Sequence, residues 1–157
     1  MTASPLIRAR LNIFERSLHL LDSLTARAGQ TAPTAPHLAT GIRGEDAAYF
    51  YLRRLGYTIV ARRWRSPKQR GDLDLIGWDG EWLCFIEVKT RSSRTVEPAE
   101  AAVDADKRTT LRRVAHEYVR LLNGAPAIPS RFDVVSVYLE KNKPAAFEIF
   151  RGAFDWK

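Results

Sequence analysis

The chain has one cysteine and three histidines among its 157 residues. One cysteine excludes an internal disulfide and a Cys-rich zinc site, and it fits a reducing compartment such as the cytoplasm. The histidines, His19, His37 and His116, are scattered and show no metal-ligand spacing. We therefore assign no chemistry to the histidines, and we expect Cys84 to be a small buried residue on a strand.

Long hydrophobic runs are also missing. No stretch approaches the roughly 20 apolar residues of a membrane span. The first residues lack the compact apolar stretch and small-residue cleavage site of a signal peptide. We expect a cytoplasmic protein with no membrane partner.

The chain has enough apolar residues for one packed domain. Its length corresponds to about one domain, and 45% of its residues are apolar. The formal charge is +7 and the pI about 9.9, which favours an anionic partner, with nucleic acid ahead of a membrane surface.

Residues 1–40 differ in composition and pattern from the rest of the chain. Apolar residues recur there at spacings of four and three, which predicts an amphipathic helix over residues 5–28 with the apolar face Ile7, Leu11, Phe14, Leu18 and Leu21. Residues 29–40, rich in Pro, Ala and Thr, predict an exposed linker. The helix has two open alternatives: it packs on residues 41–157, or it pairs with a second copy in a homodimer.

Residues 41–157 predict one mixed α/β domain. Asp79-Gly80 between two apolar runs is typical of a tight hairpin, and Gly56 closes the first helix. Asp104 or Asp106 is the expected N-cap of the second helix, which Gly124 and Pro126 end. The predicted elements are a helix over 42–55, strands over 57–64, 72–78 and 81–90, a helix along Val103 to Leu121, and strands over 131–139 and 145–151.

The predicted hairpin, GDLDLIGWDGEWLCFIEVKT, places acids among residues typical of a sheet interior. Since strand side chains alternate, Asp72 and Asp74 should share one face, with Leu73 and Leu75 on the other. In the second strand Glu87 and Lys89 likewise share a face, and the fold-back allows Asp74 to approach Glu87.

Carboxylates held close repel one another unless a cation or a proton lies between them. A hard cation such as Mg²⁺ or Mn²⁺ suits one or two carboxylates, a carbonyl oxygen and waters. Lys89 could then stabilise charge developing on a phosphate. Either motif alone is also typical of a solvated strand face, but their combination across one hairpin favours a site. Glu45 is a further candidate, although an acid in the first turn of a helix also complements the helix dipole.

Basic residues flank the acidic hairpin. Five cations fall within residues 62–70 around Trp64, which could stack on a base or belong to the core. An alternative is that these side chains form the solvated surface of a basic protein. The candidate nucleic-acid-binding residues are Arg62, Arg63, Arg65, Lys68, Arg70, Arg91, Lys107, Arg108 and Arg112.

These motifs together resemble a known family. GEDAAYFYLRRLGY, GDLDLI, FIEVKTR, the lysine of DADKRTTLRRVAHEYV, and RFDVV resemble the YraN family of small bacterial proteins, within the PD-(D/E)XK nuclease superfamily. The resemblance covers residues 44 to about 139. It implies a restriction-endonuclease-like αβββαβ core, with a central mixed sheet flanked by helices, to which the N-terminal amphipathic helix is added.

The resemblance also implies residue roles. Asp74 and Glu87 would hold a divalent metal, with the Val88 carbonyl as a further ligand. Lys89 would orient or polarise the attacking water, and Glu45 matches an acid that junction-cleaving relatives supply from their first helix.

Two positions depart from the pattern, and one lysine matches it. Leu73 replaces the proline of the superfamily name, and Asp72 stands where the family usually has glutamate, which puts a ligand role for Asp72 in doubt. Lys107 matches a helical lysine common in the family.

The expected function is that of a Mg²⁺- or Mn²⁺-dependent nuclease that hydrolyses phosphodiester bonds of DNA, including branched or repair intermediates. One alternative is a catalytically silent nucleic-acid-binding module. Another is an assembly protein that uses the N-terminal helix for docking.

Overall fold

A computed structural model of the chain describes residues 36–93, 103–122 and 128–156. The predicted helix over 5–28, Gly124 and Pro126 lie outside these residues. No helix of the described part is long and apolar enough to cross a membrane. The elements are α2 (Pro36–Leu55), β1 (Thr58–Arg65), β2 (Asp72–Asp79), β3 (Trp82–Arg91), α3 (Ala105–Leu121), β4 (Ser130–Tyr138) and β5 (Ala146–Phe154).

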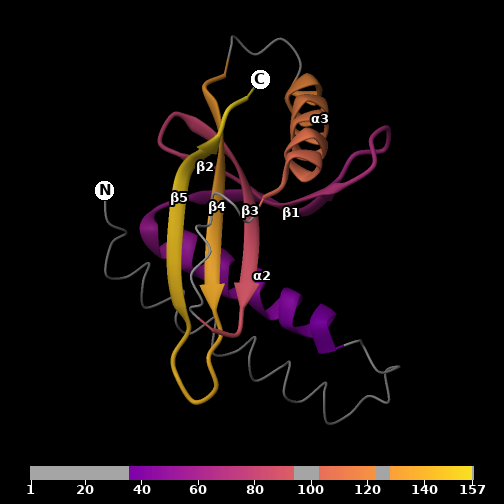
Figure 1. Ribbon diagram of the computed structural model, residues 1–157. Helices are drawn as coiled ribbons and strands as arrows, with labels where there is room; N and C mark the ends of the chain where they lie inside the picture. The colour runs from indigo at the N-terminus through magenta and orange to yellow at the C-terminus, as the bar shows by residue number, and fades with distance from the viewer. Residues whose placement is uncertain (1–35, 94–102, 123–127, 157) are drawn as a thin grey trace, which may run out of the picture.

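The predicted mixed α/β fold is confirmed. The five strands form one sheet in the order β1-β2-β3-β4-β5. All neighbours are antiparallel except β3 and β4, which are parallel and separated in sequence by α3. A parallel pair needs such a crossover because the chain must return to the same end of the sheet. Figure 1 shows α2 crossing the strands and α3 beside the curled strands β1 and β2.

The turn chemistry of the sequence is confirmed at two glycines. Gly80 has a φ of 60° in the tight turn after Asp79, and Asp79 pairs with Trp82 across it. Gly56 has a φ of 103° and ends α2. Both need the left-handed region, where only glycine is free of strain.

The sheet has a core on each face, and each core is covered by one helix. The face covered by α2, here called the α2 face, packs Leu75, Cys84, Ile86, Val135 and Val137 against Ala48 and Leu52. The opposite α3 face packs Leu73, Leu83, Phe85, Phe132 and Val134 against Leu111 and Val114. Cys84 is buried on β3, as predicted, and Trp64 packs against the α3 face rather than standing free.

The first helix begins earlier than predicted. It starts at Pro36, so residues 36–40 of the predicted linker are helical. Proline suits this first position because its missing N–H would have no partner there. Glu45 consequently lies in the middle of α2 and not in its first turn, so the helix dipole does not explain it.

The predicted alternation of β2 is wrong at Asp74. Leu73 packs on the α3 face and Leu75 on the α2 face. In a regular strand, two residues separated by one position would lie on the same face. In β1 the paired residues on either side are Arg62, opposite Leu75, and Trp64, opposite Leu73, and Arg63 between them has a left-handed φ of 48°. The regular alternation of both strands is therefore interrupted at Asp74, which the sequence pattern does not reveal.

The start of α3 follows the sequence. Asp104 is the N-cap, and its carboxylate accepts a hydrogen bond of 2.7 Å from the Lys107 N–H. This cap satisfies one of the backbone donors that lack partners in the first turn. It also fixes the position of Lys107 in the first turn of α3.

Candidate active site

The site begins where β2 and β3 stop pairing. Their last paired residues at this end are Leu75 and Ile86, so Asp74 and Glu87 are the next two opposite positions. In place of a further backbone bond, the Val88 N–H donates to Asp74 Oδ2 at 2.7 Å. The Asp74 carboxylate therefore lies between the two strands and fills the space where they separate.

Glu87 is a buried acid held between two lysines. It continues the row of Leu83 and Phe85 on the α3 face and is only 5% exposed. Lys89 Nζ lies 3.1 Å from Glu87 Oε1, and Lys107 Nζ lies 3.3 Å from Oε2. Among the described residues Oε2 nevertheless has no partner that meets the geometry of a hydrogen bond, although Lys107 lies within ion-pair distance. One buried oxygen is thus left to accept another ligand.

The pKa of the Asp74 carboxyl group is shifted by these surroundings. Burial, followed by repulsion from Glu87, raises its pKa to about 7, although the Val88 N–H acts in the opposite direction. Glu45 adds a smaller repulsion, and Lys107 a smaller attraction. Burial and the neighbouring carboxylates thus both oppose a negative charge on Asp74, and a bound cation would favour that charge.

Lys107 belongs to the acidic site rather than to an open surface. Burial opposes its charge, but the carboxylates of Glu87 and Asp74 outweigh burial and raise its pKa. The sequence pattern contained a signal for this position, since Lys107 lies on the same helical face as Leu111 and Val114, which point into the core. A charged residue at the end of a buried stripe needs a buried partner, and Glu87 provides it.

One cavity joins the candidate residues. It has a volume of about 500 Å³ and is lined by Glu45, Asp74, Glu87 and Val88 together with Thr40, Gly41, Thr90 and Ser92. α2 thus contributes Glu45 from one face of the sheet, and Lys107 of α3 approaches Glu87 from the other. Glu45 also forms an ion pair with Arg63, which draws β1 toward the same place.

Close packing of α2 on β3 sets the position of Glu45. A Cβ atom added at Gly44 would overlap the Thr90 hydroxyl and lie 2.8 Å from the Thr90 Cβ. Only glycine lets the helix approach the strand this closely. Gly44 is therefore required for the packing of α2 on β3, and it directly precedes Glu45, which lines the cavity.

The residues present suit a divalent ion held by few protein ligands. In the described part of the chain no three His, Cys, Asp or Glu residues gather into a metal-binding group. Two carboxylates, a carbonyl oxygen and several waters are nevertheless the donor set that Mg²⁺ prefers. Asp74, Glu87 and the Val88 carbonyl could supply it, and the unpartnered Glu87 Oε2 fits such a ligand.

Asp72 lies apart from this cavity. Its Oδ2 is 3.9 Å from Arg65, and it lines a separate depression with Ser66 and Gln69. The interrupted alternation at Asp74 explains why two acids in an Asp-x-Asp pattern do not line the same cavity.

Most of the candidate nucleic-acid-binding cations are engaged within the protein. Five of them form ion pairs with carboxylates and two donate to backbone carbonyls, whereas Arg70 is exposed and Arg91 half-buried at the end of β3. The contacts are Arg62 with Asp46, Arg63 with Glu45, Arg65 with Asp72, Lys68 with Glu117, Lys107 with Glu87, Arg108 with the Val103 carbonyl and Arg112 with the Asp155 carbonyl.

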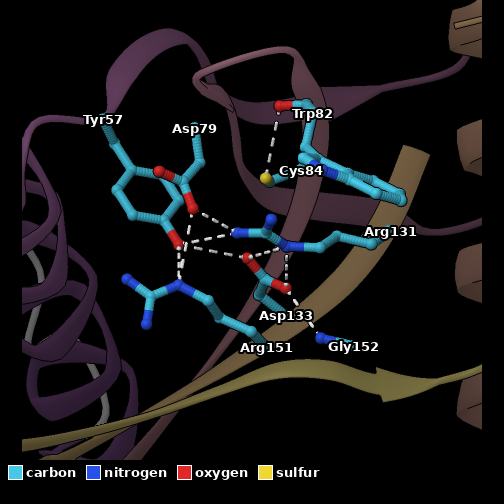
Figure 2. Close-up of polar contacts among 8 residues, drawn as sticks. All are labelled: Tyr57, Asp79, Trp82, Cys84, Arg131, Asp133, Arg151 and Gly152. Atoms are coloured by element: carbon cyan, nitrogen blue, oxygen red, sulfur yellow. Dashed lines mark hydrogen bonds and ion pairs between the residues drawn. The ribbon is translucent and has the colours of Figure 1, made fainter. Parts of the chain in front are cut away.

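A second polar cluster occupies the hairpin end of the sheet (Figure 2). Arg131 donates to Asp133 at 2.9 Å and to Asp79 at 2.6 Å. The Tyr57 hydroxyl accepts from Arg131 at 3.0 Å and from Arg151 at 3.1 Å. Two arginines thus balance two carboxylates around one phenol.

This cluster connects strands β2, β4 and β5 with Tyr57, which lies between α2 and β1. Asp133, which is fully buried, also accepts from the Gly152 N–H of β5 at 3.0 Å. Burial and the nearby Asp133 raise the pKa of Tyr57, which keeps the phenol neutral. Each polar side chain has partners inside the cluster, so we interpret the Arg131 and Asp133 of the RFDVV motif as structural.

The comparisons with other proteins agree with the sequence resemblance. A family model described as "Uncharacterised protein family UPF0102" matches residues 44–137. A UPF0102 protein of Koribacter versatilis is 51% identical over 139 residues, which cover 88% of this chain and 92% of that protein. UPF0102 proteins of Solibacter usitatus and Moorella thermoacetica are 49% and 41% identical, over 71% of this chain and 82% and 91% of their own lengths.

Proposed function

The chain belongs to the UPF0102 family, which is the YraN family, and we propose that it is a metal-dependent nuclease that hydrolyses phosphodiester bonds of DNA, including branched or repair intermediates. The observation that carries the proposal is the convergence of Asp74 and Glu87 on one cavity where β2 and β3 separate. Two lysines contact the buried Glu87 beside it.

The proposed ligands of the ion are the carboxylates of Asp74 and Glu87 and the Val88 carbonyl. A bound Mg²⁺ or Mn²⁺ would supply Lewis-acid polarisation of a phosphate oxygen. Asp74 is held in place for this role by the Val88 N–H, and Glu87 by its lysines.

Lys89 and Glu45 act on the reacting groups in this proposal. The Lys89 ammonium does not line the cavity but contacts Glu87, which does; in this proposal it stabilises the negative charge that grows on the phosphate as water attacks phosphorus and the P–O bond to the leaving oxygen breaks. Glu45 lines the cavity, where in this proposal its carboxylate orients the water by accepting a hydrogen bond.

A catalytically silent nucleic-acid-binding module is the second candidate. It is favoured by one observation: both Glu87 oxygens face lysines, so this buried charge is balanced without a metal ion. Binding alone, however, does not require acids that repel phosphate. The nuclease proposal explains Asp74, Glu45 and Glu87 together.

The proposal includes DNA as the partner, since the net charge of +7 attracts an anionic polymer. It also includes the cytoplasm as the location, since a single cysteine fits a reducing compartment. Homodimer formation or docking through the N-terminal helix stays a prediction, because that helix lies outside the described residues. Light scattering of the full chain and of a chain lacking residues 1–40 measures whether that segment controls mass.

A cleavage assay tests the nuclease proposal. Labelled single-stranded, duplex and branched DNA, with an RNA strand for comparison, are incubated with the full chain in Mg²⁺, Mn²⁺ or EDTA. We expect cleavage that needs the metal and falls at least a hundredfold in Lys89→Ala and in Asp74→Asn. Asp72→Asn is the matched control, because it changes an acid of the same strand outside the cavity.

Two results would overturn the proposal. The first is cleavage that persists when Asp74 and Lys89 are both changed to alanine. The second is the absence of cleavage of every substrate in either metal while DNA binding is retained, which supports the silent module.

A further inference from the structure

A second cavity adjoins the acidic one and has the opposite charge. Its volume is about 770 Å³, and Thr40 and Ser92 line both cavities. The inference drawn from it rests on the proposed function, because it concerns how a nucleic-acid strand reaches Asp74 and Glu87. An acidic site repels the backbone it must cut, so cations near it are needed to hold that backbone.

The lining of this second cavity is basic. Four cations and one carboxylate contribute to it, from α2 and from the turn between β4 and β5: Arg43, Arg54, Lys141, Lys143 and Glu140. Lys143 is paired with Glu140. Arg43 and Lys141 are exposed, and within the described ranges neither forms an ion pair. These two can exchange counterions for phosphate without breaking an internal contact.

This distinguishes them from the cations of β1. Arg62, Arg63 and Arg65 each pair with a carboxylate of α2 or β2. To contact a phosphate, each of these arginines would first have to break its ion pair with a carboxylate. The sequence order favoured β1, but among the described residues the cations without an ion pair include Arg43 and Lys141 of the adjoining second cavity.

Aromatic and hydroxyl groups complete the second cavity. Phe147 lines it and stacks on Tyr51, with ring centroids 4.4 Å apart and an angle of 4° between the planes. Aromatic side chains in such grooves offer nucleobases a stacking surface. The exposed hydroxyls of Thr40 and Ser92 stand at the junction of the two cavities and can donate to phosphate oxygens.

We propose that this second cavity is a phosphate-binding groove, which holds the sugar-phosphate backbone of the nucleic-acid strand on one side of the bond that is cut. Arg43 and Lys141 are its principal phosphate contacts. Single-stranded or unpaired DNA fits it best, because only an unpaired strand offers phosphates and an unstacked base together.

Binding measured without metal tests the groove separately from cleavage. Fluorescence anisotropy gives the Kd of a fluorescein-labelled single-stranded DNA and of a matching duplex in EDTA, over about 50 to 200 mM NaCl. Each lost phosphate contact lowers the magnitude of the slope of log affinity against log salt by about 0.7 for single-stranded DNA and about 0.9 for duplex. We expect Arg43→Ala/Lys141→Ala to lower the slope for single-stranded DNA by about 1.4 and to weaken binding of single-stranded DNA more than binding of duplex.

Arg53→Ala/Arg113→Ala is the matched control. It also removes two positive charges that form no ion pair among the described residues, and neither residue lines the groove or the acidic cavity. We expect its slope to equal that of the unchanged chain. The groove proposal fails if Arg43→Ala/Lys141→Ala keeps the original slope, or if the control loses as much, since the loss would then follow net charge alone.

The two proposals fail in different ways. Binding that depends on Arg43 and Lys141 without cleavage in Mg²⁺ or Mn²⁺ keeps the groove and rejects the nuclease. Cleavage with a Kd and a KM unaffected by the double variant keeps the nuclease and rejects the groove. If both hold, the double variant raises KM and leaves kcat nearly unchanged, since neither residue lines the acidic cavity.

Discussion

The Val88 N–H donates to Asp74 Oδ2 at 2.7 Å, so a side chain takes over where the backbone ladder between β2 and β3 ends. The bond fixes the carboxylate of one strand against the backbone of the next. It also keeps the strands apart at the point where Glu87 faces the cavity. Geometry and charge at this position can be separated, because asparagine retains the acceptor oxygen and removes the charge.

Asp74→Asn should stabilise the metal-free protein at neutral pH. The pKa of about 7 lies above the ordinary carboxyl value near 4, so the folded chain holds a proton that the unfolded chain releases between these values. Stability of the unchanged chain therefore falls as pH rises from about 4 to about 7. Urea unfolding in EDTA should show Asp74→Asn more stable by about 2–4 kcal/mol at about pH 8, with little difference near pH 4. A constant difference across this range would contradict the assignment.

Lys107→Met should strengthen binding of a divalent ion. Lys107 and the ion compete for Glu87 Oε2, so removing the ammonium removes a competitor and leaves more negative charge. We expect Mn²⁺ to bind about tenfold tighter, measured by titration calorimetry without DNA. Lys68→Met is the control, since Lys68 contacts the buried Glu117 at 3.8 Å, outside the cavity lining. Weaker Mn²⁺ binding in Lys107→Met would show that the lysine supports the ion instead.

Gly44→Ala should destabilise the fold and displace Glu45. The added methyl meets Thr90 where α2 packs on β3, and overpacking of this kind costs about 1–3 kcal/mol. Gly41→Ala is a control in the same helix, because nothing lies within 4 Å of its added Cβ, and it should be neutral or stabilise by about 0.5–1 kcal/mol. Thermal unfolding measures both. Thr90→Ala should partly rescue Gly44→Ala, and equal effects of the two glycine changes would refute the close-packing account.

Asp133→Ala should be the most destabilising single change away from the cavity. It leaves the guanidinium of Arg131 without its buried partner, which costs about 3–5 kcal/mol. Chemical denaturation gives the loss, and Glu81→Ala at the exposed turn after Gly80 is the control, with a loss of about 0.5 kcal/mol or less. A loss as small as that of the control would mean that the cluster in Figure 2 contributes little to stability.

Local patterns in the sequence were sufficient to predict most of the elements. The Asp-Gly turn, the glycine after α2 and the cap at Asp104 are formed by neighbouring residues, and each was confirmed. The start of α2 was missed because Pro36 looks like part of a linker, although proline is also favoured at a helix start.

Relationships between distant residues were not determined in this way. The faces of Leu73 and Leu75 depend on the backbone of Arg63 in the neighbouring strand. The partners of the β1 arginines lie on α2 and β2, and the second cavity combines α2 with a turn about a hundred residues later.

The sequence by itself determined the alternation of helices and strands, the acids of one hairpin and the basic net charge, because each of these is a property of neighbouring residues or of composition. The tertiary structure alone decided that Lys107 reaches Glu87, that Asp72 is excluded from the cavity, and that Arg43 and Lys141 are exposed without an ion pair to any other described residue. These outcomes depend on strand twist and on helix packing across the sheet. Twist and packing place charges in space independently of their order in the chain.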